Sequence, residues 1–158
     1  MYKKHLVSSL LAISLSTLAA ASWASAGHGN SEKVSDADVD RTITVEAGDM
    51  WFDPEDIEAS TGETIKFEIT NTGSIEHEFT IGDESAQEEH RDMMQEMSEG
   101  DGGHHMSEGS DGMASVTIEP GETEELVWTV PDSVKNLEYA CNIPGHYESG
   151  MYGNVTVK

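Results

Sequence analysis

Hydrophobic and polar residues alternate along several short stretches of the chain. The clearest is 65–70, where Ile65, Phe67 and Ile69 are separated by polar residues. Stretches with the same period lie at 42–45, 75–81, 116–118, 126–130, 137–141 and 155–157, and a further short run begins at Ile57. Turn residues separate them, for example Asn71-Thr72-Gly73. A period of two is typical of strands that bury one face, and many short strands with frequent turns predict an all-β fold, an antiparallel β-sandwich.

One segment, residues 83–113, interrupts this pattern. It has ten acidic side chains and one basic side chain, Arg91, and it holds five of the eight methionines and three of the seven histidines. A β-sandwich needs no such segment, so we interpret it as an insertion between two strands. It leaves residues 41–82 and 114–158 as the sandwich, a core small enough to be marginal by burial alone.

Within the insertion, one histidine and three methionines have the spacing of a helix face. His90, Met93, Met94 and Met97 stand at i, i+3, i+4 and i+7. This spacing predicts a helix from about Glu84 to Ser98 with these four side chains on one side. A polar tail rich in glycine follows the predicted helix.

The first 26 residues have the pattern of a secretory signal peptide. Two lysines precede an apolar run over 6–21, and Ala24-Ser25-Ala26 matches the motif that signal peptidase cleaves. The apolar run is short for a membrane-spanning helix. We therefore expect cleavage after Ala26, export to a bacterial periplasm and no membrane attachment afterwards. Residues 27–40 are polar and aperiodic, which predicts a flexible leader before a domain at 41–158.

The chain is strongly acidic, with 31 Asp and Glu against 8 Lys and Arg and a formal net charge of -23. Nucleic acid is excluded as a partner, because phosphate binding depends on Lys and Arg. An anionic membrane surface is disfavoured for the same reason. The acidity fits either a basic protein partner or a saline habitat, and we expect a monomer.

The single cysteine, Cys141, needs an explanation in an exported protein, where cysteines are usually paired. It is either a small buried hydrophobe or a metal ligand. Cys141, His146 and Met151 form a C-x4-H-x4-M motif on a loop between two predicted strands. Thiolate, imidazole and thioether donors together select copper, and a Cys/His/His set with an axial Met is the type 1 arrangement. The second histidine required is His77, which lies on a predicted strand far upstream.

These motifs resemble those of a known family. The sequence CNIPGHYESGM at 141–151 resembles the ligand loop of cupredoxins, nearest to rusticyanin and auracyanin, and its C-x-x-P-G-H is also found in azurins. The sequence TGETIKFEITNTGSIEHEF at 61–79 resembles the strand, turn and strand that carry the first histidine of the family. The resemblance implies a Greek-key β-sandwich with one type 1 copper, and it implies His77, Cys141 and His146 as equatorial ligands and Met151 as the axial ligand.

Each of these residues also has a simpler explanation when it is taken alone. His77, between Ile75 and Phe79, would fit as a hydrogen-bonded core residue, and Met151 would fit as a packing residue. Their joint occurrence with an otherwise unexplained cysteine favours copper. One position departs from the family: cupredoxins often have Asn or Ser after the first histidine to brace the ligand loop, whereas this chain has Glu78. Its backbone N–H could still donate to the sulfur, and the side-chain brace is left open.

The insertion and the leader hold further candidate copper ligands. Thioethers suit Cu(I) and imidazoles suit Cu(II). The alternative is that the methionines pack an amphipathic helix against the sandwich. Similar inserts occur in periplasmic cupredoxins associated with copper tolerance, and this chain resembles that subgroup. The candidates are His90, Met93, Met94, Met97, His104, His105, Met106, Met113 and His28.

Three functions are compatible with these observations. The favoured one is a copper-handling cupredoxin of the copper-tolerance kind, which binds copper ions and works with a redox or copper-transfer protein partner. The second is a dedicated one-electron carrier, and the third is a metal-free, adhesion-like sandwich. The chain has no H-C-H motif of a multicopper oxidase and no C-x3-C motif of a dicopper site, so we expect no enzyme.

Overall fold

The computed structural model describes residues 38–99, 113–133 and 136–158. The predicted signal peptide and most of the predicted leader lie outside these residues, as does the end of the insertion. The described strands are β1 (Arg41–Gly48), β2 (Trp51–Asp53), β3 (Asp56–Ala59), β4 (Thr64–Asn71), β5 (His77–Asp83), β6 (Ala114–Ile118), β7 (Thr123–Thr129), β8 (Leu137–Ala140) and β9 (Tyr152–Val157). The described helices are α1 (Glu84–Glu99) and the 3-10 turn η2 (Tyr147–Ser149).

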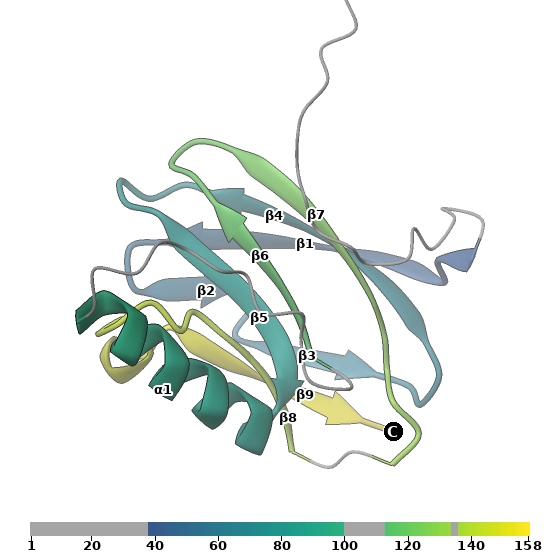
Figure 1. Cartoon of the computed structure of the whole chain (residues 1–158). Coiled ribbons are helices and arrows are strands. Elements are labelled where there is room, and N and C mark those ends of the chain that lie inside the picture. The colour runs from purple at the N-terminus through teal and green to yellow at the C-terminus, as the bar shows by residue number, and fades with distance from the viewer. Residues whose placement is uncertain (1–37, 100–112, 134–135) are drawn as a thin grey trace, which may run out of the picture.

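The strands form two sheets that pack face to face (Figure 1). One sheet has the order β2-β1-β4-β7, and the other has the order β3-β9-β8-β5-β6. The predicted β-sandwich with an inserted helical segment is therefore confirmed. Most strand pairs are antiparallel, as expected, but β1 pairs with β4 and β3 pairs with β9 in parallel, which the alternation did not predict. Between β1 and β4 the chain crosses to the other sheet and back, and such crossovers, which allow parallel pairing, leave no mark in the alternation itself.

The core between the sheets is built by the inward residues of the alternating stretches. On β4, Ile65, Phe67 and Ile69 are fully buried, and the residues between them are half-buried. Phe79 of β5 packs against Phe67 with ring centroids 5.2 Å apart, and stacks on Tyr139 of β8 at 5.3 Å. This aromatic cluster joins the two sheets. Phe79 and Tyr139 stand two residues from His77 and Cys141, so the core sets the positions of both.

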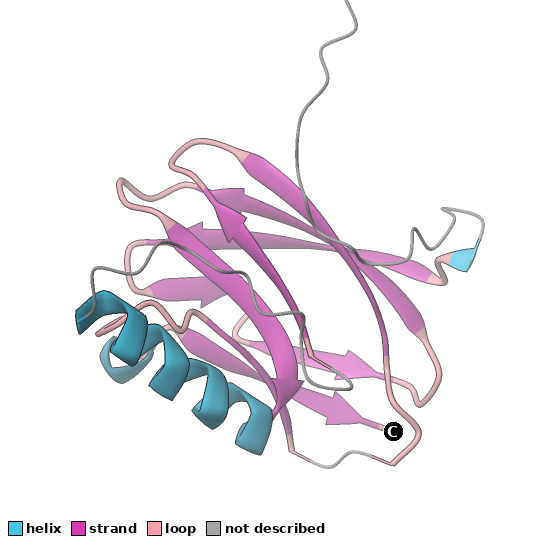
Figure 2. Cartoon of the chain, in the orientation of Figure 1, coloured by secondary structure: helices cyan, strands magenta, loops and turns pink. Residues whose placement is uncertain are grey.

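The inserted helix α1 lies on the outer face of the five-stranded sheet, where it contacts β5 and β8 (Figures 1 and 2). It starts where the sequence predicts and ends one residue later. The carboxylate of Asp83 caps its first turn, because Oδ1 accepts hydrogen bonds from the Ala86 N–H and the Ser85 hydroxyl. In the part of the chain that the structure describes, no helix has the length and hydrophobicity needed to cross a bilayer.

Candidate metal centre

Three of the four predicted ligands meet at one end of the sandwich. His77 is the first residue of β5, and Cys141 directly follows β8. These two strands pair antiparallel, with Thr80 opposite Ala140, so the start of one lies beside the end of the other. The ligand atoms of His77, Cys141 and His146 all lie within 4.8 Å of one another. The Sγ of Cys141 is 3.2 Å from Nδ1 of His146.

The loop between β8 and β9 closes on itself and brings Met151 back to the cysteine. The backbone N–H of Cys141 donates to the carbonyl of Met151 at 3.0 Å. The N–H of Met151 donates to the carbonyl of His146 at 3.1 Å. Gly150 makes this return possible, because its φ of 101° belongs to the left-handed region that favours glycine. The backbone of Met151 is thus hydrogen-bonded to both Cys141 and His146. Its side chain is fully buried.

Burial keeps all three clustered donors electrically neutral in the metal-free protein. It raises the pKa of the Cys141 thiol to about 12, although the N–H of Glu78 opposes this by donating to the sulfur. Burial lowers the pKa of His77, and the charge of His146 lowers it further. Burial likewise lowers the pKa of His146. At neutral pH the centre offers a thiol and two neutral imidazoles, so no positive charge opposes the entry of a cation, and a metal held there would take the place of the thiol proton.

The side chain of His77 is buried without a hydrogen bond among the described residues. Neither of its buried ring nitrogens has a hydrogen-bond partner there. Nε2 is 3.6 Å from Oδ1 of Asp49, which is too long for a hydrogen bond. An unpaired buried polar nitrogen is destabilising, and coordination to a metal would remove this cost. The donor set of two imidazoles, a thiol and a nearby thioether therefore fits copper.

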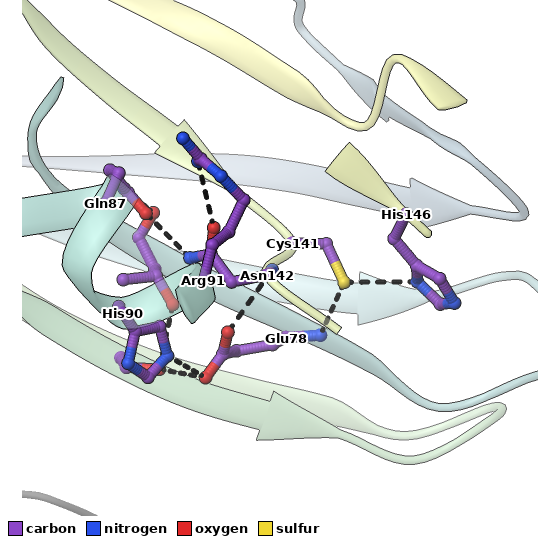
Figure 3. Close-up of polar contacts among 9 residues, drawn as sticks. Glu78, Gln87, His90, Arg91, Cys141, Asn142 and His146 are labelled. Carbon is purple, nitrogen blue, oxygen red and sulfur yellow. Dashed lines mark hydrogen bonds and ion pairs between the residues drawn. The ribbon is translucent and has the colours of Figure 1, made fainter. Parts of the chain in front are cut away.

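The side chain of Glu78 braces the ligand loop in place of the usual Asn or Ser. The carboxylate Oε2 of Glu78 accepts a hydrogen bond from the backbone N–H of Asn142 at 3.3 Å. The backbone N–H of Glu78 also donates to Cys141 Sγ, at 3.3 Å (Figure 3). Its Oε1 accepts from the Ser115 hydroxyl and from Nε2 of His90, both at 2.9 Å. Burial alone would raise the pKa of Glu78, but the hydrogen bond and charge of His90, together with the Ser115 bond, bring it below its usual value. The brace is therefore an ionised carboxylate.

The remaining candidate ligands are dispersed. Nε2 of His90 is bonded to Glu78, and its Nδ1 has no hydrogen-bond partner among the described residues. Met93, Met94 and Met97 are half-buried on α1, as the packing alternative expects, and Met113 is half-buried beside Gly82. No second cluster of three His, Cys, Asp or Glu donors is found within the described ranges. His28, His104, His105 and Met106 lie outside those ranges.

Sequence analysis missed several residues that contact the ligand loop or its brace, among them Asn142, Gln87, Arg91 and Ser115. Asn142 was part of the quoted loop motif but had no assigned role. Gln87 and Arg91 bond to its side chain, at 2.7 Å and 3.3 Å. The spacing of Gln87, His90 and Arg91, at i, i+3 and i+4, could have indicated that they share one face of the predicted helix.

Comparisons with known proteins agree with this geometry. Residues 39–158 match the family model described as copper binding proteins, plastocyanin/azurin family. The chain is 35% identical over 181 residues to the "Copper-resistant cuproprotein CopI" of Pseudomonas aeruginosa PAO1, a match that covers all of this chain and 99% of the relative. It is 41% identical over 100 residues to the protein of the same name from Vibrio cholerae, which covers 63% of this chain and 54% of that one. Among solved structures, the reduced auracyanin of Roseiflexus castenholzii superposes with a TM-score of 0.62 at 23% identity, covering 76% of this chain and 98% of that one.

Proposed function

The chain belongs to the plastocyanin/azurin family of copper-binding proteins, and from this premise we propose that it holds one copper ion in a type 1 site and serves copper tolerance. His77, Cys141 and His146 would hold the ion, and the thioether of Met151 would supply a fourth, weaker donor. The observation that carries the proposal is the convergence of three buried donors within 4.8 Å around a histidine with no hydrogen-bond partner among the described residues. Bound copper would supply one-electron exchange between Cu(II) and Cu(I).

The role in copper tolerance is supported by similarity along the whole chain. The relative that aligns with all of its residues is named a copper-resistant cuproprotein. We propose export to the periplasm from the signal-peptide pattern that ends at Ala26. The protein acts as a copper-binding protein and not as an enzyme, and additional copper is held by the Met- and His-rich segments.

A redox role is compatible with the same site. His146 is the one proposed ligand that is not fully buried, with 8% of its surface exposed. Exposed Pro144 and half-buried Ile143 stand in the same loop. An apolar rim beside a nearly buried ligand suits electron exchange with a protein partner, so a one-electron carrier is the second candidate.

Substitution of the thiolate tests the site directly. We expect Cys141→Ser to abolish the intense visible absorption that thiolate-to-copper charge transfer produces in the loaded protein. Urea unfolding of the copper-free variant is the control for folding. A variant that folds and retains the band would contradict the ligand assignment.

Counting bound copper tests the additional capacity. The full chain without its signal is expected to bind more than one copper, and deletion of residues 100–112 is expected to reduce the number to one without loss of the visible band. The deletion is limited to these residues so that α1 is kept. Helix α1 contacts β5 and β8, the strands next to the proposed ligands, and its loss would disturb the site itself. Equal copper content and equal growth under copper stress for both proteins would contradict a role of residues 100–112 in copper binding and tolerance.

A further inference from the structure

We propose that the inserted helix α1 positions the copper ligands, with His90 as the residue that holds the Glu78 brace against the loop. The inference deepens the proposed type 1 site and rests on it. Its basis is a regularity of the structure: the residue that follows each proposed ligand belongs to a contact network anchored on α1. These four residues are Glu78, Asn142, Tyr147 and Tyr152.

The first contact runs from His90 to the residue after His77. His90 and Glu78 are both buried, at 9% and 4% exposure, and are joined by a 2.9 Å hydrogen bond. The same carboxylate accepts the N–H of Asn142, and the N–H of Glu78 donates to Cys141 Sγ. A shift of Glu78 would therefore reach the sulfur through two backbone N–H groups. His90 limits that shift from the helix side (Figure 3).

The second contact runs from Gln87 to the residue after Cys141. Gln87 is fully buried, and its Oε1 accepts from Nδ2 of Asn142 at 2.7 Å. Its Nε2 donates to the carbonyls of Thr80 at 2.9 Å and Glu138 at 3.2 Å, so it also joins β5 to β8. Every polar atom of this amide is paired, which fixes its orientation and that of Asn142.

The third contact joins Arg91 to Tyr147, the residue after His146, and through Tyr147 to Tyr152, the residue after Met151. The guanidinium lies 3.6 Å from the ring centroid of Tyr147 and also donates to Oδ1 of Asn142 at 3.3 Å. Tyr147 in turn stacks on Tyr152, with centroids 4.8 Å apart. A cation over an aromatic face is attractive, and more so where water is partly excluded. Arg91 thus holds the far side of the loop.

Together these contacts give α1 a role beyond covering the sheet. Groups that hydrogen-bond to ligands and their neighbours set ligand orientation, and their loss commonly lowers metal affinity by about 10- to 100-fold. A helix that only covers apolar surface would affect stability and leave the electronic structure of the site unchanged. The two roles therefore differ in the property that a substitution changes.

The test compares His90→Ala with His90→Gln and with Glu89→Ala in the full chain. The amide of Gln can still donate to Glu78, and Glu89 is an exposed residue of the same helix. We expect His90→Ala to shift the visible absorption bands, the copper hyperfine splitting and the reduction potential, and to raise the copper dissociation constant about tenfold. His90→Gln is expected to restore most of each change, and Glu89→Ala is expected to match the unsubstituted protein.

Arg91→Ala provides a second variant that leaves the buried Glu78 pair intact, and it is expected to shift the same spectra by a smaller amount. If His90→Ala is too unstable to load copper, unchanged spectra and potential in Arg91→Ala overturn the inference. Unchanged spectra, potential and affinity in a folded His90→Ala variant overturn it as well, even if that variant unfolds more easily. If the unsubstituted protein itself lacks the thiolate-to-copper band, the proposed type 1 site fails, and the inference fails with it.

Discussion

Strands β4 and β5 have the same alternating sequence pattern but very different surroundings. On β4 the outward residues are half-buried, and Lys66 pairs with Glu68 at 3.1 Å in contact with solvent. On β5 six of seven residues are buried, including the outward Glu78 and Thr80, because α1 lies over them. Alternation therefore shows which residues face the core. Whether the residues of the opposite face are buried or exposed depends on what packs against them. In this protein the covered face carries the brace of the metal centre.

The largest expected effect on stability is at Glu78, which is compared with Glu68, a glutamate at an outward position on β4. We expect Glu78→Ala to lower the free energy of unfolding by about 3 kcal/mol, because it leaves the buried donors of His90 and Asn142 without their acceptor. Glu68→Ala removes an exposed ion pair and is expected to change it by no more than about 0.5 kcal/mol. Urea unfolding of the copper-free proteins measures both. Equal effects would show that α1 does not seal this face of β5.

A smaller effect is expected at the buried amide of α1. Gln87→Ala removes the acceptor of Asn142 Nδ2 and the side-chain donor to two backbone carbonyls, which we expect to cost about 2 kcal/mol. Glu88→Ala, at the next and exposed position of the helix, is the matched control and is expected to be nearly neutral. The same unfolding measurement applies. A Gln87→Ala variant as stable as its control would mean that water replaces the lost contacts.

The smallest effect on stability is expected at the N-terminal cap of α1, the helix that covers β5 but not β4. Asp83→Ala removes the cap of α1 and is expected to cost about 1 kcal/mol at neutral pH. Hydrogen bonds from the Ser85 hydroxyl and then the Ala86 N–H lower the pKa of Asp83 below its ordinary 3.8. The folded-state pKa is the lower one, so the ionised form is stabilising above the unfolded-state value, and this contribution is lost as pH falls through the folded value.

Asp83→Asn isolates that pH dependence, because Asn can cap the helix and does not titrate. The stability advantage of the natural chain over Asp83→Asn is expected to shrink as the pH is lowered from neutral to about 3. Urea midpoints of the copper-free proteins at several pH values measure it. A constant difference across this range would show that the ionised carboxylate contributes nothing beyond the cap itself.

Part of the metal centre could be predicted because three of the proposed ligands are close together in the sequence. Cys141, His146 and Met151 lie within one short loop, and their donor chemistry is a property of the residue types. His77 could be added because the alternation puts it on a strand and the family resemblance supplies its role. The paired carboxylate of Glu78 could not be predicted, since a glutamate on the outward side of a strand usually faces solvent.

The sequence by itself determined the sandwich, the position of the inserted helix and the residue types that select copper, because periodicity and donor chemistry are properties of neighbouring residues. Tertiary structure alone decided that β1 and β4 run parallel, that the outward face of β5 is buried, and that α1 contacts the residues after His77, Cys141 and His146. These features depend on contacts between segments far apart in the chain. The hydrogen bonds that join them are stronger where packing excludes water from both partners.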